Sequence, residues 1–234
     1  MNEQDNELDL DINLETQSIA EITSETDDWS TGEITTISDE EIAEIVKGDE
    51  KPFYVEFISL YEGLSNNKRH YTKEAVKSCI EAMPGVNMYK GHQEPGTESW
   101  CYREPVGKIV AARETTVTID GQRVLAAKGK AYITEADPKL RSDISKKMAG
   151  PVSILGNARA VQELGSSKRT VTHIHKPLKS IDFCNPGTNG MVHAGVTSVV
   201  REMAEDNDNP DEPIEPRTSV VMEKLSKEAL LAEY

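Results

Sequence analysis

The sequence of 234 residues has few cysteines, few aromatic residues and no long apolar run. Its three cysteines, Cys79, Cys101 and Cys184, form no C-x-x-C pair, so their spacing indicates neither a disulfide framework nor a zinc ribbon. No stretch approaches the roughly 20 apolar residues that a membrane-spanning helix needs. The first residues, MNEQDNELDLD, are acidic, whereas a signal peptide begins with basic and then apolar residues. These absences predict a soluble protein of a reducing compartment.

Basic residues are scarce at both ends of the chain. Residues 1–50 contain 17 Asp or Glu and a single basic residue, Lys47, and residues 201–234 contain 10 acidic and 4 basic residues. Residues 51–200 are mildly basic, with 21 Lys or Arg against 14 Asp or Glu. The net charge of −15 argues against a dedicated nucleic-acid-binding protein. We expect the acidic N-terminal segment to be attracted to the basic centre.

The composition predicts three regions. Residues 1–50 bury too little apolar surface to offset the entropy of ordering, so we expect a mostly disordered acidic segment with a short helix near 38–46. Residues 51–200 form the folded domain. Residues 201–234 form an acidic, proline-containing linker and a short amphipathic C-terminal helix.

The folded domain alternates β-rich runs with turn residues. Asp120-Gly121 is the strongest hairpin signal in the chain, and Thr72 and Asp137 can each cap a helix. The expected elements are a strand over 52–60, a helix over 73–83, hairpin strands on either side of 120–121, a helix from 137 to about 150, and strands within 151–162 and 170–184. We therefore predict a mainly β (α+β) fold, a small antiparallel β-barrel, closed or nearly closed, with two or three flanking helices.

Three polar residues interrupt or end separate apolar strands. His92 ends the strand VNMYKGH, Ser153 lies within GPVSILG, and Asp182 lies within SIDF, where a carboxylate is costly unless it is paired. Each residue alone is also explained as an ordinary polar side chain. A nucleophilic serine needs a base within hydrogen-bond reach and a third group that orients the base. These residue types are therefore candidates for a catalytic serine site.

A second candidate is the pair His173 and His175. Alternate residues of a strand point to the same face, so this pair provides half of a metal site. Two solvent-facing histidines explain the pattern equally well, and no acidic residue or cysteine lies at ligand spacing nearby. We predict that the protein needs no metal or cofactor and keep a metal hydrolase as a minor alternative.

Four motifs, in order, resemble the prohead (capsid maturation) serine proteases of tailed bacteriophages. They are SNNKRHYTKEAV, GHQEP followed by PVGKIV, GPVSILGNARA, and SIDFCNPGTNGM, which together cover about residues 54–195. The sequence departs from the family pattern at Thr72 and Gln93, where that family usually has proline. The resemblance implies a fold related to the herpesvirus assemblin protease.

The resemblance also implies roles for the three polar residues. His92 corresponds to the general base, Ser153 to the nucleophile and Asp182 to the third member of the triad, with Glu104 and His175 as weaker alternatives for that place. The oxyanion would be bound by backbone N–H groups of residues 156–159 or of residues 185–190, between which the sequence does not decide.

The function that this family implies is a serine endopeptidase acting inside the immature capsid, in the host cytoplasm. Its partners would be the major capsid protein and the scaffolding protein, with no membrane and no specific nucleic acid, and homo-oligomerisation is compatible with this role. Self-processing is expected, for example after Glu44. The alternative function is a non-enzymatic internal scaffold or assembly protein that keeps the protease fold.

Overall fold

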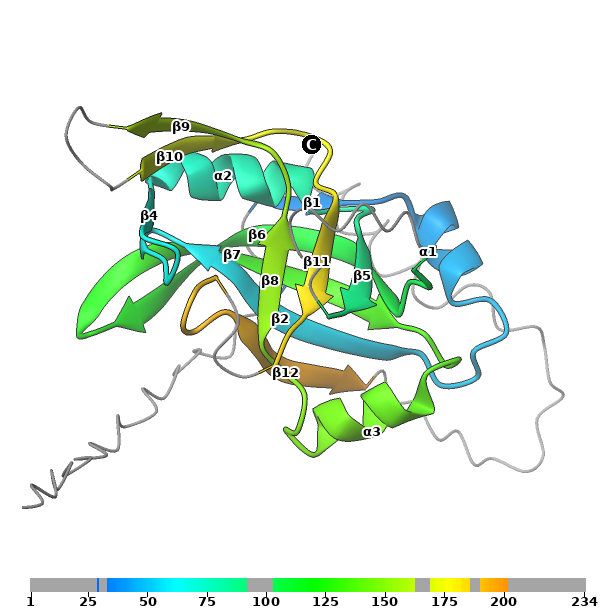
Figure 1. Cartoon of the computed structure of the whole chain (residues 1–234). Coiled ribbons are helices and arrows are strands. Elements are labelled where there is room, and N and C mark those ends of the chain that lie inside the picture. Colours follow the sequence, from blue (N-terminus) through cyan, green and yellow to red (C-terminus); the bar gives the residue numbers. More distant parts are fainter. Residues whose placement is uncertain (1–28, 30–32, 92–102, 163–168, 186–189, 202–234) are drawn as a thin grey trace, which may run out of the picture. The chain divides into compact units, whose positions relative to one another are not determined.

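The computed structural model describes residues 29, 33–91, 103–162, 169–185 and 190–201. Within these residues the chain is mainly β with three helices, which confirms the α+β class (Figure 1). None of these helices is long and apolar enough to cross a membrane. The expected C-terminal linker and helix lie outside the described residues. The elements are β1 (Ile34–Thr36), α1 (Asp39–Ile45), β2 (Phe53–Tyr61), β3 (Gly63–Leu64), β4 (Arg69–Tyr71), α2 (Lys73–Ala82), β5 (Asn87–Lys90), β6 (Gly107–Ile119), β7 (Gln122–Ile133), α3 (Pro138–Ser145), β8 (Val152–Leu155), β9 (Ala158–Gln162), β10 (Arg169–Ile174), β11 (Ser180–Phe183) and β12 (Gly195–Arg201).

The large sheet has eight strands. Seven follow the order β12-β2-β7-β6-β5-β11-β8, and β1 adds to β6. Neighbouring strands are antiparallel except β5 and β11, which run parallel. The hairpin β6–β7 turns at the expected place, because Asp120 and Gly121 both adopt positive φ angles, 50° and 77°, which suit a tight two-residue turn.

The expected barrel is wrong, because the sheets are not closed into one. The end strands of the large sheet, β12 and β8, meet at a single isolated bridge between Pro151 and Gly195. Two backbone hydrogen bonds flank it, from the Val152 N–H to the Ala194 carbonyl and from the Val196 N–H to the Gly150 carbonyl. Pro151 has no N–H to donate, and the chain leaves β8 after four residues, so no ladder develops there.

A second sheet of four strands, β3-β4-β10-β9, lies against α2. The expected strand over 151–162 is in fact two strands, because the chain passes from β8 into β9 through Gly156 and Asn157. A Cβ at Gly156 would lie 2.7 Å from the end of the Leu178 side chain, so a larger residue here would force that leucine to move. The run 170–184 is likewise divided, into β10 in the small sheet and β11 in the large sheet.

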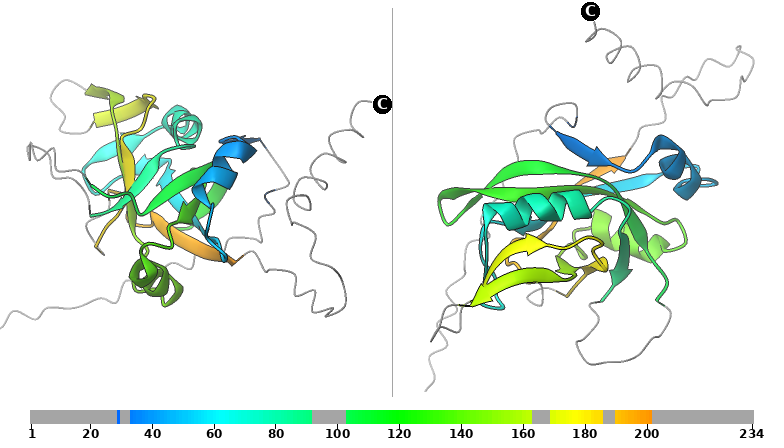
Figure 2. Two further views of the ribbon diagram at one scale, coloured as in Figure 1. Left: turned by 90° about the vertical axis from the view of Figure 1, so that its right-hand side faces the viewer. Right: turned by 90° about the horizontal axis from the view of Figure 1, so that it is seen from above.

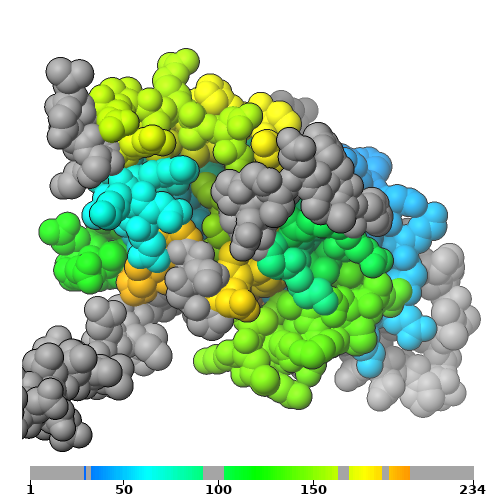
Figure 3. All heavy atoms as spheres, in the orientation of Figure 1, coloured from blue at the N-terminus to red at the C-terminus, as the bar shows by residue number. Residues whose placement is uncertain are grey.

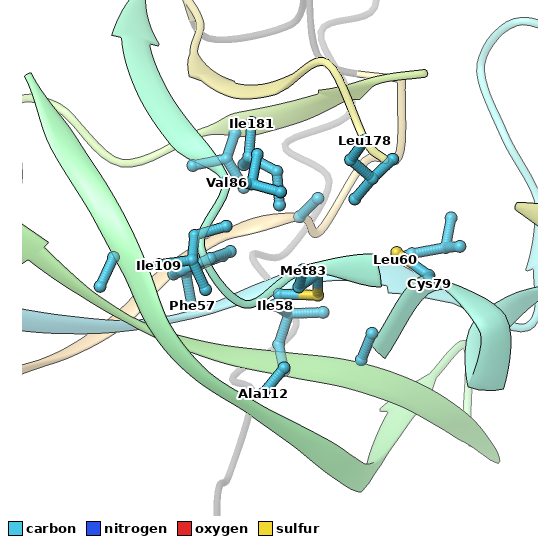
Figure 4. Close-up of a cluster of buried hydrophobic side chains, with 14 of the residues drawn as sticks. Phe57, Ile58, Leu60, Cys79, Met83, Val86, Ile109, Ala112, Leu178 and Ile181 are labelled. Atoms are coloured by element: carbon cyan, nitrogen blue, oxygen red, sulfur yellow. The ribbon is translucent and has the colours of Figure 1, made fainter. Parts of the chain in front are cut away.

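The main core lies between α2 and the large sheet. Thr72 caps α2 as expected, with its hydroxyl accepting a hydrogen bond from the Ala75 N–H. Met83, at the end of the helix, packs near Phe57 and Ile58 of β2, and Ile109 and Ile181 complete the apolar layer (Figure 4). This layer buries one face of β11, so the other face of that strand is available to polar side chains.

Within the mostly disordered segment expected over 1–50, the short helix expected near 38–46 is confirmed as α1, whereas the strand β1 before it was not expected. β1 pairs with β6, and α1 follows with Ser38 and Glu41 forming a capping box. Both elements lie on the side of β6 and β7 away from α2 (Figure 2). Glu44, the expected cleavage position, lies within α1, where the backbone is already hydrogen-bonded and less accessible to a protease than a flexible segment.

A buried ion pair joins β2 and β7 within the large sheet, and Trp29, which precedes β1, donates a hydrogen bond to it. Lys128 Nζ lies 2.9 Å from Glu56 Oε2, and both side chains are almost fully buried. The carboxylate also accepts hydrogen bonds from Ser198, at 2.7 Å, and from the Trp29 indole. Burial raises the pKa of Glu56, but these hydrogen bonds outweigh it and hold that pKa below its usual value. The resulting stability is present at neutral pH and is lost as the pH falls through the lowered pKa.

We predict that Lys128→Ala lowers the free energy of unfolding by about 3–5 kcal/mol, because it leaves the Glu56 charge buried without a cation. The matched control is Lys77→Ala, which breaks the exposed 3.6 Å pair with Glu114 and should cost about 0–1 kcal/mol. Urea denaturation of both variants measures the difference. Equal losses in the two variants would contradict a structural role for the buried pair.

Candidate active site

The structure places Ser153 and Asp182 directly opposite each other on neighbouring strands. Ser153 of β8 is in register with Asp182 of β11, and Asp182 is in register with Tyr89 of β5 on its other side. Residues in register on adjacent strands project from the same face of a sheet, so these three side chains form one row. Asp182 is fully buried and Ser153 is 9% exposed, so both side chains are buried in this row.

Arg103 compensates the charge of Asp182. Its Nη2 lies 3.6 Å from Asp182 Oδ1, and its guanidinium stacks on the Tyr89 ring with a centroid distance of 4.5 Å. The same Nη2 donates to the carbonyls of Lys90, at 3.3 Å, and of Gly91. Arg103 therefore joins the buried carboxylate to the end of β5. Sequence reasoning missed this residue, since nothing in the local pattern REPVG indicates a partner 79 positions away.

His92 lies outside the described residues. Its neighbour in the sequence, Gly91, is described: its N–H donates to the Phe183 carbonyl of β11 at 2.8 Å, and its φ of 75° is in the left-handed region that favours glycine. The described chain therefore reaches the end of β11, one residue past Asp182, immediately before position 92.

Gly190 borders both the Ser153 hydroxyl and the Asn67 amide. A Cβ at Gly190 would lie 3.7 Å from Ser153 Oγ and 3.8 Å from Asn67 Nδ2, so both polar groups face the space beside this glycine. The Asn66 N–H donates to the Gly190 carbonyl at 2.9 Å, which ties the two loops together. The first and last of the four sequence motifs thus meet at Ser153.

The two described cysteines are not activated nucleophiles. Burial raises the pKa of Cys79 to about 12. Burial and, secondarily, the charge of Asp182 raise the pKa of Cys184, whose thiol donates to the Asp182 carbonyl at 3.4 Å. At neutral pH both thiols are protonated, and a thiolate is the reactive form. Serine is therefore the better candidate nucleophile in this row.

The other candidates of the sequence lie elsewhere. Glu104 is exposed and precedes β6. His173 and His175 make an edge-to-face ring contact, with centroids 5.1 Å apart, at the end of β10 in the small sheet. Among the residues that the structure describes, no three His, Cys, Asp or Glu side chains gather closely enough to hold a metal ion. The row on β5, β11 and β8 is thus the candidate active site.

We predict that Gly190→Ala lowers the reactivity of Ser153 towards a fluorophosphonate at least about tenfold, equivalent to about 1.4 kcal/mol in the barrier. The added methyl would lie at ordinary contact distance from its neighbours, so the fold should persist, but it would occupy the space that a reacting group needs beside Oγ. Gly150→Ala is the matched control, because its Cβ would meet nothing within 4 Å. Labelling rates and urea denaturation measure both effects, and unchanged labelling of the Gly190 variant would contradict this geometry.

Comparison with known proteins adds no family to this description. No protein-family model matches the sequence, and neither a curated protein nor a solved structure is similar enough to match.

Proposed function

We propose that this protein is a serine endopeptidase of the prohead-maturation type, with Ser153 as nucleophile, His92 as general base and Asp182 as the third member of the triad. The observation that carries the proposal is the register of Ser153 with Asp182 on adjacent strands. It places a buried carboxylate, with Arg103 as its cation, and the hydroxyl of Ser153 on one face of the sheet. The four motifs that resemble this protease family, taken in order, provide the second support.

The proposed mechanism uses this chain's own residues throughout. Ser153 Oγ attacks the scissile carbonyl carbon while His92 accepts the hydroxyl proton, and His92 then donates that proton to the leaving amine. Asp182 would orient the imidazole and stabilise its charged form. Of the two segments considered for the oxyanion, 185–190 is favoured, because its last residue, Gly190, borders Ser153 Oγ. We also propose that the fold is related to that of the herpesvirus assemblin protease, with sheets that are not closed into a barrel.

The proposed substrates are the scaffolding and major capsid proteins of an immature phage head, in the host cytoplasm. Flexible segments of these proteins would enter the site in extended form, as proteases generally require. Self-processing would then occur in the acidic segments outside the described residues more readily than after Glu44 in α1.

The alternative is a non-enzymatic assembly protein that keeps this fold. The contact between Arg103 and Asp182 is the observation that favours it, because a buried carboxylate that already has a cation 3.6 Å away needs no catalytic histidine to explain it. In that case Asp182 would act only in stability. The two functions make opposite predictions for substitutions at Ser153 and Asp182.

We predict that a fluorophosphonate labels Ser153 in the wild-type protein and that Ser153→Ala abolishes both labelling and peptide cleavage without changing the fold. The reason is that only a serine activated by a neighbouring base reacts rapidly with such a reagent. Ser180→Ala is the matched control, a buried serine on the adjacent strand β11, and should label normally. Peptide mapping by mass spectrometry locates the label. Folded wild-type protein that does not label at Ser153 would favour the assembly protein.

We predict that Asp182→Asn lowers kcat by about 10³–10⁴-fold, because a neutral amide does not hold the imidazole in the required tautomer. Glu104→Gln, an exposed carboxylate beside Arg103 in the sequence, is the matched control and should keep full activity. Steady-state cleavage of a peptide is measured together with urea denaturation. A variant that loses stability but cleaves at the wild-type rate per folded molecule would assign Asp182 to the Arg103 contact alone.

A further inference from the structure

The small sheet ends in an exposed edge strand. β9 is last in the order β3-β4-β10-β9, and within the described residues it pairs with β10 alone. All five of its residues are exposed, and the strand lies at the surface of the molecule (Figure 3). An open edge of this length is a template for another strand, which natural proteins usually cover or block. The side chains on β9 and its neighbouring strands indicate what kind of strand fits this edge.

The two faces of β9 differ in chemistry. Ala158 and Ala160 are in register with Ile174 and Val171 of β10, which are buried in the core that includes α2. At its outer end this face carries Gln162, in register with Arg169. On the other face, Arg159 is in register with His173, and the exposed Val161 is in register with Thr170. Over residues 158–160, a strand added to β9 would therefore meet apolar side chains on one face and a basic side chain on the other.

The small sheet carries basic residues on three of its four strands, β4, β9 and β10. Its strands contain no Asp or Glu, and Arg159 and Arg169 make no ion pair with any acidic residue that the structure describes. The exposed basic and histidine side chains of these strands are Arg69, His70, Arg159, Arg169 and His173. The edge therefore favours an acidic strand over a neutral or basic one.

The N-terminal segment contains such a strand pattern. Residues 8–14 read LDLDINL, a strict alternation of Leu or Ile with Asp or Asn, which is the pattern of a strand with one apolar and one polar face. Residues 7–15 carry four acidic residues and no basic one. No other part of the acidic segment alternates over this length.

We propose that residues 8–14 add to β9 as an edge strand of the same molecule. Leu8, Leu10, Ile12 and Leu14 would cover Ala158 and Ala160, and Asp9 and Asp11 would lie on the face of Arg159. The 14 residues between this segment and Trp29 can extend over about 45–50 Å, while a domain of this size has a radius of gyration of about 15 Å. The segment can therefore reach β9 from the far side of the large sheet.

The proposal gives the acidic segment a defined place on the molecule. It covers the open edge and neutralises the basic sheet, so it predicts that the segment suppresses association of β9 with other extended acidic chains. Because β9 follows the Ser153 strand after Gly156 and Asn157, the proposed strand lies on the chain segment that leaves the candidate site. The proposal does not depend on proteolytic activity.

Hydrogen–deuterium exchange of the Ser153→Ala protein, with residues 1–234 intact, tests the proposal. This variant is used because it lacks the proposed nucleophile and so keeps its N-terminal segment. We expect slow exchange of the β9 amides, and about tenfold or faster exchange in the double variant Leu10→Asp/Ile12→Asp. The matched control is Ile19→Asp/Ile22→Asp, in the same acidic segment but outside the alternation. Arg159→Glu should accelerate exchange as well, whereas Arg123→Glu, exposed on β7, should not. Equal exchange of β9 in all variants would overturn the proposal.

Disulfide trapping distinguishes pairing within one molecule from pairing between two. Ala160→Cys is combined in turn with Leu8→Cys, Leu10→Cys and Ile12→Cys, since residues in register on adjacent strands have Cβ atoms about 4.5–5.5 Å apart. Glu25→Cys with Ala160→Cys is the control. We expect at least one pair to form an intramolecular disulfide faster than the control. The proposal would be overturned if disulfides formed only between two molecules, or if none formed faster than in the control pair.

Discussion

The pairing of β11 with β5 on one side and β8 on the other is the constraint on which the candidate site depends. β11 has four residues, all buried, and one of them is the carboxylate of Asp182. Ile181, next to it, belongs to the apolar core, and alternation along the strand then fixes Asp182 on the opposite face. The register of the two pairings places Tyr89 and Ser153 in the same row. A shift of one residue would turn Asp182 into the core.

The two buried carboxylates of the large sheet, Glu56 and Asp182, each form an ion pair with a basic side chain. These contacts also hold residues outside the sheet strands in place. Glu56 has Lys128 on the adjacent strand, together with Trp29, which precedes β1. Asp182 has Arg103, which also holds the end of β5 through backbone carbonyls. A buried carboxylate without a partner at either position would cost several kcal/mol of stability. The contacts of Trp29 and Arg103 therefore fix the positions of these two residues, although neither lies in a strand of the large sheet.

Local signals predicted local structure well. Thr72 capping a helix, Asp137-Pro138 beginning one, and Asp120-Gly121 turning a hairpin all depend on residues within a few positions of each other. Predictions that involved distant segments were less successful. The barrel was wrong, and each of two runs interpreted as continuous is divided between sheets. The strand β1 was also missed, because it forms by pairing with β6 and not from the composition of the segment, whereas the short helix near 38–46 was expected from its Ser38 cap.

The sequence by itself determined which polar residues interrupt apolar strands and how charge is distributed along the chain. Ser153 and Asp182 were identifiable because burying a polar group within an apolar strand costs free energy unless the group has a partner. Only the tertiary structure decided that these two residues face each other, that Arg103 accompanies Asp182, and that Gly190 lies beside the serine hydroxyl. The physical reason is that strand register and sheet order are set by packing between segments far apart in the chain, which no local pattern specifies.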